Sequence, residues 1–119
     1  MATVLCDFIK IVGDEEVNIP LVAGGAERPL PDFNPGGRRA DQTALLFYSA
    51  KKLDGTAEVF INGKKVGTIT ATPKEGVYSM QSIEVQGSEL KDGPNKIALK
   101  NVTDPFTIKN VNLFFHQND

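Results

Sequence analysis

The sequence lacks tryptophan, and among its 119 residues it has one cysteine and one histidine. A single cysteine cannot form an internal disulfide, and Cys6 lies in an apolar run, which predicts a buried small hydrophobic side chain rather than a reactive thiol. One cysteine and one histidine cannot supply the ligands of a zinc site. His116 lies three residues from the end, where we expect it to be exposed, and no nucleophile motif accompanies it. We therefore expect a protein that is not an enzyme.

Long apolar runs and an excess of one charge are also missing. The chain has 13 basic and 15 acidic residues, a formal net charge of -2, and the two signs are interspersed. Such a balance provides no cluster of positive charge that would bind nucleic acid or an anionic membrane surface. No apolar run approaches the roughly 20 residues that span a bilayer, and the first residues lack a basic n-region and a cleavage-type ending. We expect a soluble chain that binds neither nucleic acid nor membrane, cytoplasmic by default, with secretion by another route left open.

What the chain does contain is a series of short β-branched and aromatic runs bounded by glycine, proline, asparagine or aspartate. Nowhere do apolar residues recur at three-four spacing for a dozen residues, so helices are not expected. The runs predict strands near residues 3–12, 16–22, 43–50, 56–62, 65–72, 77–86, 95–101 and 106–116. We predict a single all-β domain over residues 1–119, a two-sheet antiparallel β-sandwich (jelly roll) of about eight strands.

Alternation within these runs predicts the core. The run at 43–49 is apolar on both faces, as in a central strand, and we place Leu45 and Phe47 inward. In the last run the apolar phase shifts by one residue near Lys109 and Asn110, which predicts a β-bulge. The predicted core includes Leu45, Phe47, Val59, Ile61, Ile83, Val85, Ile97, Leu99, Leu113 and Phe115.

Asn62 and Gly63 separate two predicted strands within the stretch EVFINGKKVGT, residues 58–68. An Asn-Gly pair between two such runs is the strongest short-range signal of a two-residue hairpin, because both central positions of a type I′ turn need positive φ. Direct contact with a ligand is the alternative interpretation of this pair. The turn chemistry alone explains both residues, so the structural interpretation is favoured.

The segment 23–41 is the exception to short connections. It holds three prolines and four glycines and has no strand or helix pattern. Structureless loops longer than about 12 to 15 residues are usually functional or disordered in compact domains, and both alternatives stay open. Leu30 and Phe33 are apolar anchors that could pin the segment to the sandwich, and its prolines lower the entropy of the unfolded chain.

Two turn motifs within residues 44–115 resemble those of the galactose-binding-domain-like jelly roll found in many carbohydrate-binding modules. One is the hairpin FING at 60–63, and the other is LKDGPN at 90–95, which leads into the alternating strand of Ile97 and Leu99. The resemblance implies the jelly-roll fold and a noncatalytic carbohydrate-binding, lectin-like module with a glycan ligand. These motifs also recur in domains that bind no sugar, so a structural or protein-interaction subunit of a larger assembly is the alternative. A hydrolase ranks last.

The chain departs from that family in two respects. Without tryptophan, an aromatic platform would have to come from Tyr48, Tyr78, Phe33 or Phe106, so a flat stacking face for crystalline polysaccharide is not expected. The structural calcium of the family can be matched only loosely to GDEE at 13–16, because such sites need about six to eight oxygens at defined spacing, and we predict no cofactor. Weak lectin-like sites often gain avidity from several copies, which is consistent with a homo-oligomer.

The long segment also carries the predicted ligand site. Arginine presents planar donors and aspartate matching acceptors for sugar hydroxyls, and an aromatic ring offers an apolar face to the C–H side of a sugar. Paired arginines are also common at surfaces that bind no ligand, and Asp41 could simply neutralise Arg39. The predicted ligand-binding residues are Asp32, Phe33, Asn34, Arg38, Arg39 and Asp41, with Tyr78 assisting from the start of a neighbouring strand. No residue is predicted to be catalytic or to bind a metal.

Overall fold

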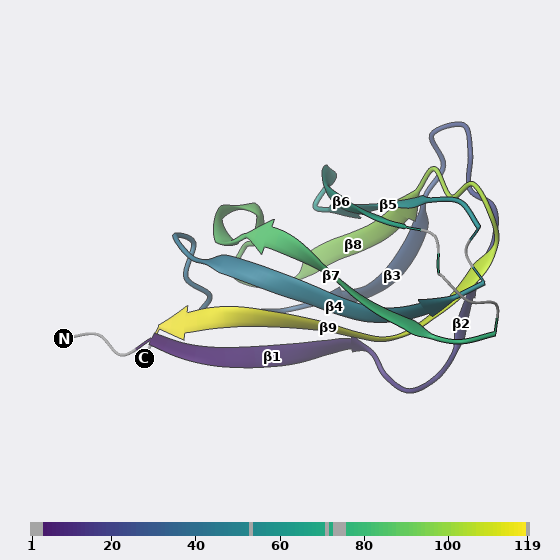
Figure 1. Cartoon of the computed structure of the whole chain (residues 1–119). Helices are drawn as coiled ribbons and strands as arrows, with labels where there is room; N and C mark the ends of the chain where they lie inside the picture. The colour runs from purple at the N-terminus through teal and green to yellow at the C-terminus, as the bar shows by residue number, and fades with distance from the viewer. Residues whose placement is uncertain (1–3, 53, 71, 73–75, 119) are drawn as a thin grey trace.

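The computed structural model of the chain describes residues 4–52, 54–70, 72 and 76–118, and the side chains of residues 4–6 and 118 lie outside this description. Within the described residues, nine strands form two antiparallel sheets that pack face to face (Figure 1). The predicted all-β sandwich is therefore confirmed. The expectation for the Cys6 side chain lies outside the described residues.

One sheet has five strands and forms the lower layer in Figure 1. Four of them lie side by side in the order β1 (Val4–Val12), β9 (Phe106–Asn118), β4 (Thr43–Lys51) and β7 (Ser79–Gln86). The short β2 (Val17–Ile19) pairs with the first residues of β9, while β1 pairs with the rest of it. The long β9 thus holds the sheet together along its whole length. His116 lies within β9 and is half-buried, so the expectation that it is exposed near the end of the chain was wrong.

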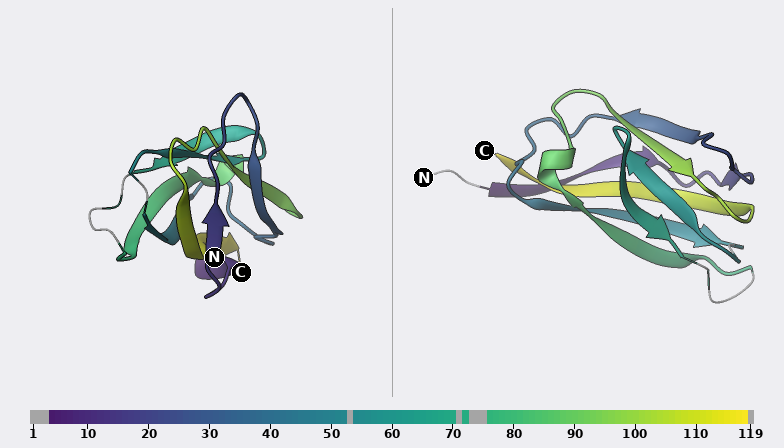
Figure 2. Two further views of the ribbon diagram at one scale, coloured as in Figure 1. Left: turned by 90° about the vertical axis from the view of Figure 1, so that its right-hand side faces the viewer. Right: turned by 90° about the horizontal axis from the view of Figure 1, so that it is seen from above.

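The other sheet has four strands in the order β3 (Arg28–Phe33), β8 (Asn95–Lys100), β5 (Ala57–Ile61) and β6 (Lys64–Ile69). A short 3-10 helix, η1 (Gly87–Glu89), lies in the connection from β7 to β8. Seen from above, these four strands form the outer surface of the upper layer (Figure 2). The chain therefore offers two sheet faces to its surroundings, one on each layer.

The β5–β6 hairpin forms as the Asn-Gly pair predicts. Ile61 pairs with Lys64, which leaves a two-residue loop, and the φ angles of Asn62 and Gly63 are 51° and 84°. Positive φ at both positions is the signature of a type I′ turn. The structural interpretation of this pair is confirmed.

The segment 23–41 is more ordered than its sequence suggests, and the expectation that it holds no strand was wrong. Residues 28–33, RPLPDF, form β3 at the edge of the four-stranded sheet. Pro29 and Pro31 gave no indication of a strand in the sequence. Proline has no backbone N–H to donate to a neighbouring strand and is therefore confined to sheet edges and bulges. Leu30 and Phe33 are buried and anchor the strand in the core, as proposed for them.

The predicted bulge in the last strand is also confirmed. Phe47 of β4 pairs with Asn112 of β9, but Ser49 pairs with Lys109, so β9 has one residue more than β4 across this stretch. Asn110 has a φ of 53° and its backbone N–H donates to the carbonyl of Gly13. The extra residue lets β9 bury residues on both sides of the phase shift.

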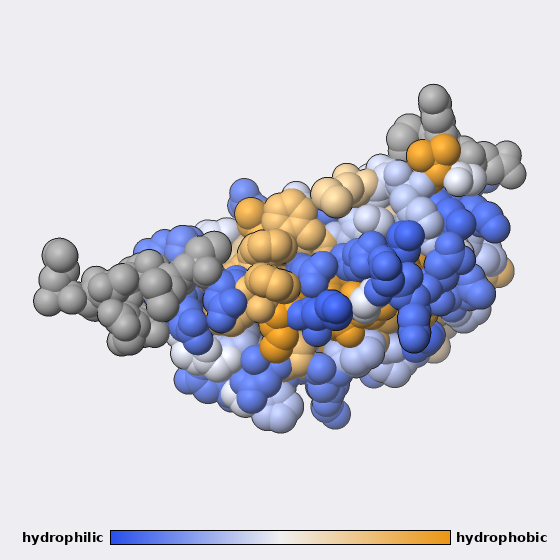
Figure 3. Space-filling model, turned by 90° about the horizontal axis from the view of Figure 1, so that it is seen from below, coloured by the Kyte–Doolittle hydropathy of each residue, from blue (hydrophilic) through white to orange (hydrophobic). Residues whose placement is uncertain are grey.

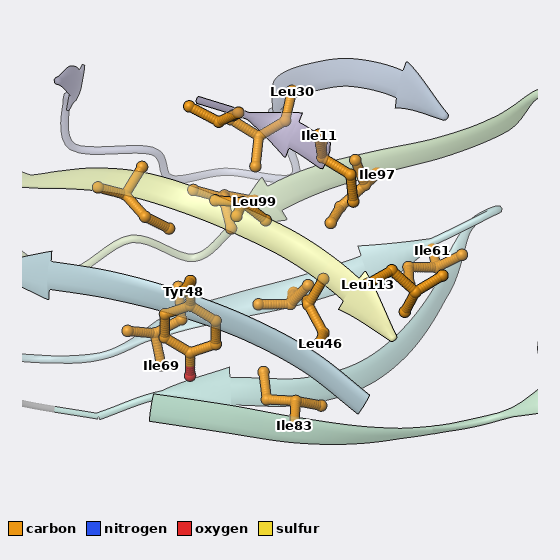
Figure 4. Packing of buried hydrophobic residues seen from close by; sticks show 14 of the residues in the cluster. Ile11, Leu30, Leu46, Tyr48, Ile61, Ile69, Ile83, Ile97, Leu99 and Leu113 are labelled. Atoms are coloured by element: carbon orange, nitrogen blue, oxygen red, sulfur yellow. The ribbon is translucent and has the colours of Figure 1, made fainter. Parts of the chain in front are cut away.

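The core lies between the two sheets and is filled by aliphatic side chains from both (Figure 4). Eight of the predicted core residues are buried, namely Val59, Ile61, Ile83, Val85, Ile97, Leu99, Leu113 and Phe115. The other two, Leu45 and Phe47, were placed on the wrong face. The inward face of β4 carries Ala44, Leu46 and Tyr48, while Leu45 and Phe47 are half-buried on the outward face of the five-stranded sheet.

Candidate functional site

Arg38 is engaged within the chain rather than free to bind a ligand. Its Nε donates to the carbonyl of Leu90 at 2.8 Å, and a terminal nitrogen lies 3.6 Å from a carboxylate oxygen of Asp92. The side chain is 18 % exposed. Both partners belong to the connection from η1 to β8, so Arg38 fastens the segment after β3 to that connection.

Arg39 and Asp41 form a pair with each other. Nε and Nη2 of Arg39 donate to the two carboxylate oxygens of Asp41 at 3.0 and 2.8 Å. The hydrogen bonds from the guanidinium lower the pKa of the Asp41 carboxyl. Because each group satisfies the other, the alternative in which Asp41 neutralises Arg39 describes the structure better than a ligand clamp.

Phe33 and Asn34 also serve the fold. Phe33 is buried in the core with 4 % of its surface exposed, so its ring cannot stack on a ligand. The Oδ1 of Asn34 accepts a hydrogen bond from the backbone N–H of Gly93, across the end of the four-stranded sheet. Of the loop residues predicted to bind a ligand, only Asp32 is exposed and lines a groove.

Tyr78 lies at the other end of the molecule. Thr43 pairs with Gln86 at one end of the β4–β7 ladder and Ala50 pairs with Ser79 at the other, so Asp41 and Tyr78 are separated by the ladder's length, roughly 25 Å. The Nζ atoms of Lys51 and Lys109 lie 4.7 and 4.3 Å from the centroid of the Tyr78 ring. The seven predicted residues therefore do not converge on one site.

A groove with a different set of residues lies on the outer face of the four-stranded sheet. Its volume is about 430 Å³, and we call it the sheet groove; its lining includes Glu27, Pro29, Asp32, Phe60, Lys96 and Ala98. Ala98 pairs with Pro29 on one side and with Phe60 on the other, which makes an apolar row across β3, β8 and β5. The volume is within the range of about 300 to 1,000 Å³ typical of small-ligand sites.

A polar row runs beside this apolar row. β3 pairs Leu30 with Ile97 and Phe33 with Asn95, so two residues, one of them Asp32, lie opposite Lys96. Glu27 precedes Arg28, which pairs with Leu99, so Glu27 lies on the opposite side of the apolar row. Within the described part of the chain, the side chains of Glu27, Asp32 and Lys96 form no hydrogen bond or ion pair. Unlike Arg39 and Asp41, these groups are available to an incoming ligand.

The rest of the outer face is already internally paired. The Nζ of Lys100 lies 4.6 Å from the centroid of the Phe60 ring, a cation–π contact. Glu58 accepts hydrogen bonds from Lys65 at 2.9 Å and from Asn101 at 2.6 Å, and these bonds lower the pKa of its carboxyl. The available polar groups are thus concentrated at the β3 side of the groove.

The Asn62–Gly63 turn borders the same groove. The side chain of Asn62 is turned into the fold, where its Nδ2 donates to Asn95 and to the carbonyl of Glu89, and its Oδ1 accepts from the backbone N–H of Lys96. The turn therefore shapes one end of the groove and fixes the backbone of Lys96, while its own polar atoms are used internally.

Most of the groove residues were not identified from the sequence. Glu27 and Pro29 fell in a segment expected to have no strand, and Phe60, Lys96 and Ala98 were assigned only to strands. A signal did exist, because Phe60 alternates with the buried Val59 and Ile61, and Lys96 precedes the buried Ile97. Outward residues of two predicted strands could have been paired if the strand order had been known.

The described residues contain no group of three or more His, Cys, Asp or Glu side chains placed to hold a metal ion, so GDEE at 13–16 does not assemble such a cluster. They also contain no helix long and apolar enough to cross a membrane. Compared with known proteins, the chain matches no family model and no curated protein.

Proposed function

We propose that the chain is a noncatalytic carbohydrate-binding, lectin-like module that binds its sugar in the sheet groove. The observation that carries this proposal is the apolar row across β3, β8 and β5, which has Asp32 and Lys96 on one side and Glu27 on the other; the side chains of these three have no partner among the described residues. A sugar ring has the same division between C–H groups and hydroxyls. The resemblance of the hairpin and of the LKDGPN turn to galactose-binding-domain-like scaffolds supports the same interpretation.

The polar and the apolar residues of the groove have different roles in such a complex. The carboxylates of Asp32 and Glu27 accept hydrogen bonds from sugar hydroxyls, and the ammonium of Lys96 donates to hydroxyl or ring oxygens. Pro29, Ala98 and Phe60 contact the C–H face of the ring. Because the groove is open to water, we expect weak binding that selects for the arrangement of hydroxyl groups.

The same two carboxylates could suggest a glycosidase, since those enzymes use a pair of acidic residues. Glu27 and Asp32 are both exposed to water. The general acid of a glycosidase instead needs an apolar environment that keeps it protonated. The exposed groove therefore supports binding rather than hydrolysis.

A glycan-array screen of the labelled chain, followed by isothermal titration of the hits, tests the proposal. We expect a hit whose affinity falls at least about tenfold in Asp32→Ala, since the lost acceptor leaves a sugar hydroxyl unpaired. Asp54→Ala, which removes an exposed carboxylate from the β4–β5 connection, is the matched control and should bind as the wild type. Absence of binding to every glycan, with co-purification of a protein partner, would overturn the proposal.

The second candidate function, a protein-interaction subunit with no sugar ligand, is favoured by a separate observation on the opposite layer of the sandwich. There an exposed apolar surface lies on the five-stranded sheet.

A further inference from the structure

The outward surface of the five-stranded sheet carries a continuous apolar patch that we call the aromatic face, made of Phe8, Leu45, Phe47, Met80 and Phe114. Phe8 is 57 %, Met80 74 % and Phe114 38 % exposed. Seen from below, apolar residues gather left of the middle of this face and extend to its upper edge, with polar residues to the right and below (Figure 3).

The register of four strands brings these residues together. Phe8 of β1 and Leu45 of β4 both pair with Phe114 of β9. The rings of Phe8 and Phe114 stack with centroids 5.6 Å apart, and the ring of Phe47 meets that of Phe114 edge to face at 5.2 Å. These contacts hold the three rings as a preformed row, so little side-chain entropy remains to be lost when a partner covers them.

A hollow of about 390 Å³ adjoins this row, and Phe47, Met80 and Phe114 form its apolar wall. Ser49 and Asn112 lie at its polar side. A face that has a hollow beside flat aromatic rings can pack against the side chains of a second sheet. The inner faces of a β-sandwich pack in this way at a spacing of about 10 Å.

We propose that the aromatic face is the interface between two copies of this chain. Four strands at about 4.8 Å and about six residues at about 3.3 Å give each copy on the order of 400 Å² of contact, or on the order of 800 Å² in total. That total lies well below the roughly 1,200 to 2,000 Å² of specific, stable interfaces and within the range of weak, transient ones. The dimer is therefore weak and reversible, and it forms at high protein concentration.

Charge at the two borders of the face favours a second copy as the occupant. Lys10 lies on β1, in register with Asn112, and Glu84 lies on β7, in register with Leu45. The two side chains stand at opposite edges of the sheet, and neither forms an ion pair within the described residues. A twofold axis parallel to the strands stacks β1 of one copy on β7 of the other, so Lys10 of each copy approaches Glu84 of the other, which gives two such pairs per dimer.

The pairing leaves the other layer free. The sheet groove lies on the outer surface of the four-stranded sheet, so a dimer formed through the five-stranded sheet presents its two grooves on opposite outer surfaces. The dimer itself does not depend on sugar binding. A result that rules out the dimer therefore leaves the proposed sugar binding untouched, and a result that rules out sugar binding leaves the dimer untouched.

Sedimentation velocity of the wild-type chain over about a hundredfold range of concentration tests the dimer. We expect the mass to rise from monomer towards dimer, and Phe8→Ser with Met80→Ser to weaken association by at least about tenfold. Leu21→Ser is the matched control, because Leu21 is 61 % exposed but lies outside the aromatic face. Circular dichroism checks that each variant is folded.

Charge exchange tests the geometry independently. Lys10→Glu and Glu84→Lys should each weaken the dimer, and the variant with both exchanges should recover wild-type association, because opposite charges meet again across the axis. A monomer at every concentration overturns the proposal. So does a dimer that neither the apolar nor the charge variants affect, or capture of the face by a different protein while the isolated chain stays monomeric.

Discussion

Nδ2 of Asn62 donates a hydrogen bond of 2.8 Å to Oδ1 of Asn95, and this contact joins the β5–β6 turn to the start of β8. Asn95 is completely buried, and its amide makes three further hydrogen bonds, to the backbone of Lys91 and Gly93. The turn motif and the LKDGPN motif are thus one connected polar network. That network sets the position of Lys96 at the edge of the sheet groove.

Replacing Asn62 by glycine should destabilise the chain by about 1 to 3 kcal/mol, because glycine keeps the positive φ but removes the side-chain bonds to β8 and to Glu89. Lys52→Gly is the control, since Lys52 also has a positive φ, 69°, and is exposed. Urea denaturation should find no loss of stability in that control. Equal effects in the two variants would mean that Asn62 acts only through its backbone.

Replacing Gly87 by alanine should destabilise the chain by about 1 to 3 kcal/mol, because a Cβ there would collide with the carbonyl oxygens of Arg39 and Gln42. Backbone atoms cannot move aside as a side-chain end can, so residues 34–42 would have to shift. Gly36→Ala, where the nearest atom is the Asn34 amide oxygen at 3.7 Å, should have little effect. Thermal unfolding of the two variants gives the comparison, and a harmless Gly87→Ala would contradict the close approach.

Truncation of Leu99 to alanine should cost about 2 to 5 kcal/mol of unfolding free energy, since the side chain is 1 % exposed in the centre of the core. Leu45→Ala removes the same atoms from the half-buried outward face of β4 and should cost clearly less. Guanidinium denaturation of the two variants measures the difference. A larger loss in Leu45→Ala would reverse the assignment of the two faces of β4.

Stability should fall in alkaline solution because of Tyr48. Burial raises the pKa of its hydroxyl to about 12, against 10.0 for an exposed tyrosine. The folded chain holds this proton more tightly than the unfolded chain, so the contribution is complete below about pH 10 and is lost as the pH rises towards 12. The unfolding free energy should drop by about 1 to 3 kcal/mol over that interval.

The matched variant is Tyr48→Phe, which has no proton to lose at this position. Urea denaturation at several pH values above about 9 should give a steeper decline for the wild type than for the variant. Parallel declines would mean that another group accounts for the alkaline loss, such as Tyr78, whose pKa is also raised to about 12 by burial.

Much of the fold could be predicted because local chemistry decides it. The Asn62–Gly63 turn needs a positive φ at both positions, which few residues adopt, and the shift of the apolar phase near Lys109 and Asn110 indicates the bulge. The edge strand β3 was not predicted because its two prolines are typical of loops, although proline is also found in strands at the edge of a sheet. Leu45 and Phe47 were predicted to point inward because β4 is apolar on both faces. Alternate residues of a strand share a face, and the face of Leu45 and Phe47 also carries Thr43, Ser49 and Lys51. These polar residues indicate that this face points outward.

The candidate site could not be predicted because it depends on strand order. Asp32, Lys96 and Phe60 are far apart in the sequence and meet only because β3 and β5 flank β8. The arginines of the long segment looked free in the sequence. They have partners in the fold, since Arg38 reaches the carbonyl of Leu90 and Arg39 pairs with Asp41.

Sugar binding in the sheet groove is tested by an NMR titration of the isotope-labelled chain with galactose, glucose, mannose and N-acetylglucosamine, followed residue by residue. We expect saturable shifts of amides around the sheet groove, at Asp32, Phe60, Gly63, Lys96 and Ala98, with at least one of these sugars. Amides near Arg39 and Tyr78 should stay in place. Shifts confined to residues outside the groove, or none with any of the four sugars up to the solubility of the chain and ligand, would contradict sugar binding in the sheet groove.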